Sequence, residues 1–121
     1  MKNCILLLMF AVFLFGCKEG DPKSITELTS DQIENGVLLD VRTPQEYNEG
    51  HLDQAINVDW LGNDFLESTK NLNKNNPVYV YCKKGGRSAK AAKFLDSLGF
   101  KSVIDLKGGY DAYVSKKKGL E

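Results

Sequence analysis

Residues 77–98, PVYVYCKKGGRSAKAAKFLDSL, decide the fold of this chain. The β-branched and aromatic run at 78–81 is too short for a helix, and a proline and two glycines bound it, which predicts a buried strand. Over residues 89–98 the apolar positions recur at helical spacing, and Gly99 follows where a left-handed C-terminal cap belongs. The sequence therefore predicts a strand, a tight loop and a helix, with Cys82 at the end of the strand.

A cysteine at this place faces the start of a helix, where backbone N–H groups and the helix dipole favour an anion. Its neighbours Lys83, Lys84 and Arg87 favour the thiolate further. We therefore expect the pKa of Cys82 to lie below the usual value of about 8.5, and Cys82 to act as a nucleophile. The alternative is a small core residue at a strand end, because free cysteines are among the most buried residues.

Four short segments carry a pattern of polar residues and glycines that recurs in one protein family. Residues 82–88 match Cys-x-x-Gly-x-Arg-Ser, and residues 40–47 match Asp-x-Arg-x-x-x-Glu-Tyr. Residues 50–57 resemble Gly-His-Ile-x-x-Ala-x-Asn, and residues 108–113 resemble Gly-Gly-x-x-x-Trp. Together, and in this order, they resemble the rhodanese-like family over nearly all of residues 24–114.

Alternating strands and helices predict an α/β fold whose parallel sheet has right-handed crossovers and helices on both faces. The resemblance implies a three-layer α/β/α architecture with five strands in the order 3-2-4-5-1, the strand before Cys82 being central. The expected strands are residues 24–26, 37–39, 55–58, 78–81 and 103–106. The expected helices include two that open with capping boxes at Thr29 and Thr43, one over residues 89–98 and one over residues 110–117. Five apolar residues at roughly helical spacing are expected to cover one face of the sheet: Trp60, Leu61, Phe65, Leu66 and Leu72.

The resemblance implies sulfur transfer, in which Cys82 takes sulfur from a donor such as thiosulfate and holds it as a persulfide. The sulfur then passes to cyanide or to a thiol acceptor, either a small molecule or a protein. The residues expected to bind the substrate are Lys83, Lys84, Gly85, Gly86, Arg87 and Ser88. Their N–H groups would hold the terminal sulfur, and the three cations would attract an anionic donor. Asp40 and Arg42 would support the loop; the alternative is that they are turn and cap residues.

Two other functions are compatible with a cysteine-to-arginine loop. Cys-based phosphatases and arsenate reductases wrap such a loop around a tetrahedral oxyanion, with five residues between Cys and Arg. This chain has four, Lys83 to Gly86, and a smaller loop suits a single sulfur atom. The second alternative is a rhodanese-like binding or sensor domain without turnover, whose signature would be loss of the cysteine.

The composition excludes other classes of site. Sixteen basic residues balance sixteen acidic ones, which argues against a nucleic-acid-binding face. His51 is the only histidine and there is no Cys-x-x-Cys, so we expect neither a structural zinc nor any cofactor. We expect His51 to be structural, because a thiolate stabilised by backbone dipoles needs no adjacent base.

The N-terminus predicts export and lipid anchoring. Residues 1–16 form an expected signal peptide, with an unbroken apolar run at 5–15 that is shorter than the roughly 20 residues of a spanning helix. The segment ending at Cys17 resembles a bacterial lipobox, so Cys17 would carry lipid; an ordinary signal peptide or an uncleaved anchor is the alternative. Residues 17–23 would then tether the domain of residues 24–118, a monomer, to the bacterial cell envelope. Cys82 would be the one free thiol left, so its sulfur must leave to an external acceptor.

Overall fold

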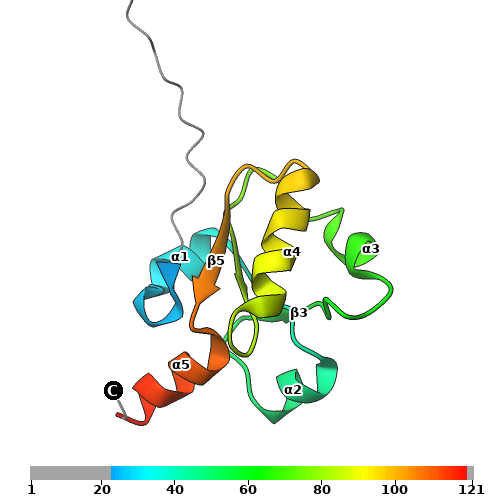
Figure 1. Ribbon diagram of the computed structural model, residues 1–121. Helices are drawn as coiled ribbons and strands as arrows, with labels where there is room; N and C mark the ends of the chain where they lie inside the picture. Colours follow the sequence, from blue (N-terminus) through cyan, green and yellow to red (C-terminus); the bar gives the residue numbers. More distant parts are fainter. Residues whose placement is uncertain (1–22, 120–121) are drawn as a thin grey trace, which may run out of the picture.

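The computed structural model describes residues 23–119, which form a five-stranded parallel sheet (Figure 1). Its strands are β1 (Lys23–Ser24), β2 (Val37–Asp40), β3 (Ile56–Asn57), β4 (Val78–Tyr81) and β5 (Val103–Lys107). Their order across the sheet is β3-β2-β4-β5-β1, with every neighbouring pair parallel. The predicted fold class and strand order are therefore confirmed, and β4 is the central strand.

Helices cover both faces of this sheet. They are a 3-10 helix η1 (Ile25–Glu27) and the α-helices α1 (Ser30–Asn35), α2 (Pro44–Glu49), α3 (Phe65–Thr69), α4 (Gly86–Ser97) and α5 (Gly109–Lys117). Figure 1 shows β5 between α1 on one side and α4 on the other. Among residues 23–119, no helix has the length and apolar character needed to cross a membrane.

The alternation of side chains along β4 divides the interior into two hydrophobic clusters. Val78, Val80 and Cys82 point into the cluster that α4 and Phe65 cover. Tyr79 and Tyr81 point into the other cluster, against η1 and α5. A strand that is apolar on both faces is typical of a parallel sheet covered on both sides, and this is why the sequence of β4 shows a continuous apolar run.

The two predicted capping boxes differ in outcome. Thr29 caps α1 with the complete reciprocal pair, in which its hydroxyl accepts from the N–H of Gln32 and the Gln32 side chain accepts from the N–H of Thr29. Thr43 also caps α2, accepting from the N–H of Glu46 at 3.2 Å. The Glu46 carboxylate, however, is bound by Arg87 of α4, so the second box forms only in half.

Some boundaries differ from the prediction. The first strand is shorter than expected, because the Ser24 hydroxyl accepts from the N–H of Thr26 and starts the 3-10 helix there. The expectation that five apolar residues after β3 cover the sheet is wrong for two of them, since Leu61 is 67% and Leu66 is 44% exposed. A turn held by Asp59 precedes α3, so the helix that these residues were expected to share does not form over its whole length.

The expected signal peptide, the lipidated Cys17 and most of the tether lie outside the described residues.

Candidate active site

The thiol of Cys82 lies at the carboxyl end of the central strand, where the loop to α4 begins. Ligands bind along this edge in open α/β sheets. Only 1% of Cys82 is exposed, and it packs within the cluster that α4 covers. The side chain is therefore buried, as expected if Cys82 were only a core residue. Whether the thiol is reactive depends on the groups that contact its sulfur.

Hydrogen-bonding groups of the loop contact the sulfur. The N–H of Gly85 donates to Sγ at 3.0 Å, and Sγ donates to the Ser88 hydroxyl oxygen at 3.5 Å, while that hydroxyl donates to the Gly85 carbonyl oxygen. Burial raises the pKa of Cys82, but the hydrogen bond with the Ser88 hydroxyl and those from the N–H groups of Ser88, Gly85 and Lys84 outweigh it, so the pKa is lowered. Such a loop stabilises a negative charge on a buried sulfur, in contrast to an apolar site, which would hold it as the thiol.

Gly85 gives this loop its shape. Its φ of 132° lies outside the range that side chains readily adopt, and no atom lies within 4 Å of where a Cβ would be placed. The glycine is therefore required by backbone conformation and not by space. Gly86 is the first residue of α4, three positions earlier than the predicted helix.

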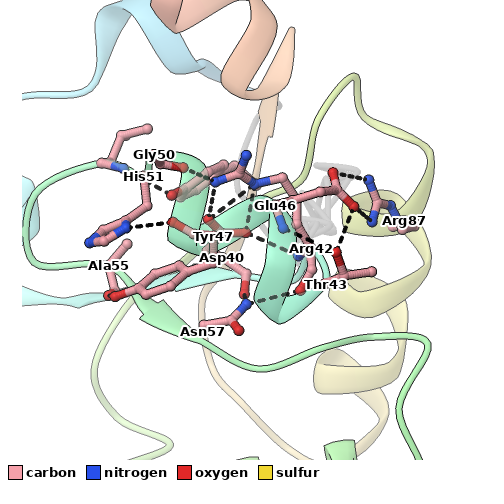
Figure 2. Close-up of polar contacts among 12 residues, drawn as sticks. Asp40, Arg42, Thr43, Glu46, Tyr47, Gly50, His51, Ala55, Asn57 and Arg87 are labelled. Atoms are coloured by element: carbon pink, nitrogen blue, oxygen red, sulfur yellow. Dashed lines mark hydrogen bonds and ion pairs between the residues drawn. The ribbon is translucent and has the colours of Figure 1, made fainter.

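Arg87 is occupied by a partner that the sequence did not indicate. Its guanidinium donates to both carboxylate oxygens of Glu46, at 2.7 and 3.0 Å (Figure 2). This pairing lowers the pKa of Glu46 to about 2, because Arg87 donates to its carboxylate, and raises that of Arg87. The expected role of Arg87, attracting an anionic donor, stays a prediction; in the structure its charge is paired with this carboxylate, and the pair links α4 to α2.

Asp40 and Arg42 form a buried ion pair at the end of β2, with exposed fractions of 0% and 3%. Arg42 donates to the carboxylate through Nε and through Nη2, the latter at 2.6 Å, and Nη2 also reaches the carbonyl of Gly50 (Figure 2). Its guanidinium lies 4.2 Å from the centroid of the Tyr110 ring. The resemblance implied that Asp40 holds the active-site loop; here it orients Arg42, which in turn contacts the start of α5.

A pocket of about 290 Å³ opens beside the loop. Its lining combines charges of both signs with one aromatic ring: Arg42, Glu46, Glu49, Lys83, Tyr110 and Asp111. Lys83 is the expected substrate-binding residue that faces this pocket, whereas the side chain of Lys84 is exposed outside the lining. The volume is close to the lower end of small-molecule sites.

His51 contacts Tyr47 and is not among the groups that contact the sulfur. The two rings stack at 3.7 Å between centroids, and Nδ1 of His51 lies 2.9 Å from the Tyr47 carbonyl oxygen. Within residues 23–119, no three His, Cys, Asp or Glu side chains gather as metal ligands.

Glu46 and the start of α5 are the parts of this site that sequence reasoning missed. Glu46 belongs to the Asp-x-Arg-x-x-x-Glu-Tyr segment, and its place three residues after Thr43 predicts only a helix-capping role. The one sequence feature that points to its role is Arg87, the cation at the end of the cysteine loop, which lies 41 positions later in the chain.

Comparison with known proteins shows the family to which the chain belongs. The family described as "Rhodanese-like domain" matches residues 24–116. A chloroplast thiosulfate sulfurtransferase of Arabidopsis thaliana is 40% identical over 68% of this chain and 75% of that protein. An uncharacterised protein of Bacillus subtilis is 32% identical, with 98% of both chains covered. A tRNA uridine(34) hydroxylase of Pelagibacter ubique is 36% identical over 84% of this chain, which spans only 33% of that protein's length.

Solved structures show the same fold. A rhodanese-related protein of Thermoplasma volcanium has a TM-score of 0.63 at 31% identity, over 71% of this chain and 83% of that one. A human single-domain sulfurtransferase has a TM-score of 0.65 at 23% identity, over 80% of this chain and 98% of that one.

Proposed function

The chain belongs to the rhodanese-like domain family, and from this premise we propose that it is a sulfurtransferase that carries sulfane sulfur as a persulfide on Cys82. The observation that supports this most is the environment of Sγ, which accepts the N–H of Gly85 at 3.0 Å and has a lowered pKa although it is buried. A thiolate is the reactive form of cysteine, and here the loop itself provides it without a neighbouring base.

The proposed cycle has two displacement steps. In the first, the Cys82 thiolate attacks the outer sulfur of thiosulfate, the S–S bond breaks, and sulfite leaves with the bonding electron pair. The product is a Cys82 persulfide, whose terminal sulfur carries the negative charge and remains within reach of the loop N–H groups. In the second, an acceptor nucleophile attacks that terminal sulfur and the Cys82 thiolate leaves. Cyanide becomes thiocyanate, and a thiol acceptor becomes a persulfide.

The 290 Å³ pocket beside Lys83 is the proposed entry for donor and acceptor. Lys83 provides a cation next to Cys82 for an anionic donor, whereas the charge of Arg87 is balanced by Glu46. Among the relatives, one is named a thiosulfate sulfurtransferase, which supports thiosulfate as a donor to try first.

We also propose that Cys17 is lipidated and that the domain acts at the bacterial cell envelope. The support is the sequence alone: an apolar run at residues 5–15 followed by a lipobox-like segment ending at Cys17. In that setting the acceptor is a thiol outside the domain, because Cys82 is the only cysteine of the described residues.

The proposal is tested by assaying one preparation of the protein for sulfur transfer, to cyanide and to small thiols, and for hydrolysis of an aryl phosphate. We expect thiocyanate to form from thiosulfate and cyanide, and this activity to disappear in Cys82→Ser. No thiocyanate, and no sulfur transfer to small thiols, would favour a binding or sensor domain. Hydrolysis of an aryl phosphate that depends on Cys82 would favour a phosphatase instead.

A further inference from the structure

Helix α5 begins against the backbone of the cysteine loop. The N–H of Tyr110 donates to the carbonyl oxygen of Cys82 at 2.8 Å, and the N–H of Asp111 donates to that of Lys83 at 3.1 Å. The first N–H groups of a helix have no partner inside the helix, so they are free to bind elsewhere. Here two of them are used to hold two consecutive peptide groups at the reactive thiol.

These two hydrogen bonds also fix the direction in which the neighbouring N–H groups of the cysteine loop point. In a trans peptide group the C=O and N–H bonds point in opposite directions. A Lys83 carbonyl held toward α5 therefore turns the N–H of Lys84 away from α5. That N–H is one of the backbone donors that lower the pKa of Cys82. The contact between Asp111 and Lys83 thus orients the peptide plane directly before the one that carries the N–H of Gly85, which donates to Sγ at 3.0 Å.

Gly109 makes this close approach possible. It is buried, and its φ of 63° is in the left-handed region that favours glycine. A Cβ at Gly109 would overlap the carbonyl group of Lys83 and would lie 2.7 Å from the carbonyl oxygen of Cys82. Both obstacles are backbone atoms of the loop, so a side chain here would push α5 and the loop apart.

We propose that Gly109 and the first turn of α5 are a positioning element, which holds the peptide planes of Cys82 and Lys83 so that the loop N–H groups face Sγ. The proposal rests on the proposed function in taking Cys82 as the reacting group. Gly109 touches no substrate, so its effect reaches the chemistry only through the loop. This positioning role gives a physical reason for the family segment at residues 108–113, which the sequence alone does not indicate.

The test is Gly109→Ala, with Gly119→Ala as a matched control. Gly119 also has a positive φ, 70°, but no atom lies within 4 Å of its Cβ position, so alanine there brings the same backbone strain without the clash. The rate of Cys82 alkylation by iodoacetamide is measured against pH, following the Cys82 peptide by mass spectrometry, in folded protein. The wild type and both variants keep the charged groups of the loop, Lys83, Lys84 and Arg87. A difference between their pH profiles therefore does not come from these charges.

We expect the midpoint of this profile to rise by about one pH unit in Gly109→Ala, equivalent to about tenfold less thiolate at pH values below both midpoints. We expect Gly119→Ala to match the wild type. A folded Gly109→Ala protein with the wild-type midpoint would overturn the proposal, because a merely structural glycine would alter stability and leave the midpoint in place.

A second measurement covers the case in which Gly109→Ala does not fold. In the wild-type protein, the amide resonances of Lys84, Tyr110 and Asp111 are followed by NMR while the thiol titrates. We expect all three to shift with one midpoint; a shift of Lys84 alone would overturn the proposal. Neither measurement uses sulfur transfer. Both expected results, in a protein whose Cys82 takes no sulfur from thiosulfate, would contradict the proposed function and leave this inference standing.

Discussion

Replacing Glu46 by Gln is expected to lower the free energy of unfolding at pH 7 by about 1–2 kcal/mol. The hydrogen bonds and charge of Arg87, with smaller contributions from hydrogen bonds of Thr43, lower the pKa of Glu46 from 4.5 to about 2 against the effect of burial. A difference of about 2.5 units at about 1.4 kcal/mol per unit sets a ceiling of roughly 3.4 kcal/mol. The side chains of Arg87 and Glu46 are 23% and 27% exposed, and screening by solvent reduces the ceiling to the expected value.

The direction of the pKa shift also determines how this stabilisation depends on pH. Because the pKa is lower in the folded state, the contribution is complete above about pH 4.5 and is lost as the pH falls toward about 2. Urea denaturation of wild type and Glu46→Gln should show a difference that falls to less than half between pH 7 and about pH 3. Glu67→Gln, which breaks an exposed pair with Lys70, is the control and should cost under about 0.5 kcal/mol. A difference that is unchanged by pH, or no larger than in the control, would refute the reasoning.

Three further substitutions test other parts of the structure. Gln54, with a φ of 65°, is the only non-glycine residue with a positive φ in the described chain, so Gln54→Gly should stabilise the protein by about 0.5–1 kcal/mol in urea denaturation; no gain would show that the turn is unstrained. Arg42→Met should cost about 3–5 kcal/mol, because it leaves the fully buried Asp40 carboxylate unpaired, and a loss below about 1 kcal/mol would contradict this. Cys17→Ser should move the protein from the membrane to the soluble fraction of cells, and protein that stays membrane-bound would rule out the lipid anchor.

The central strand and its helix could be predicted because their signals are local. The apolar run at Val78–Tyr81 and the helical spacing after Ala89 each occupy one stretch of sequence, and Gly99 does end α4 with a left-handed conformation. The segment around α3 could not be predicted in the same way. Leu61 and Leu66 have helical spacing, but a turn at Asp59 separates Leu61 from the helix and leaves both exposed.

The position of the thiol could also be predicted, because a strand end followed by glycines places Cys82 beside a helix start. The groups that hold its loop from outside could not, since they come from distant parts of the chain. Glu46 meets Arg87 across 41 positions, and the N–H of Tyr110 meets the Cys82 carbonyl through the packing of α5 on the loop. The local pattern at Thr43 and Glu46 suits a capping box, and only the placement of α2 against α4 shows that the carboxylate binds the arginine.

The mass of the intact protein after treatment with thiosulfate, under non-reducing conditions, tests most directly whether Cys82 carries sulfur. We expect the wild type to gain the mass of one sulfur atom and to lose it again when cyanide is added, and Cys82→Ser to gain none. A wild-type protein whose mass does not change, or an equal gain in Cys82→Ser, would contradict the proposed persulfide.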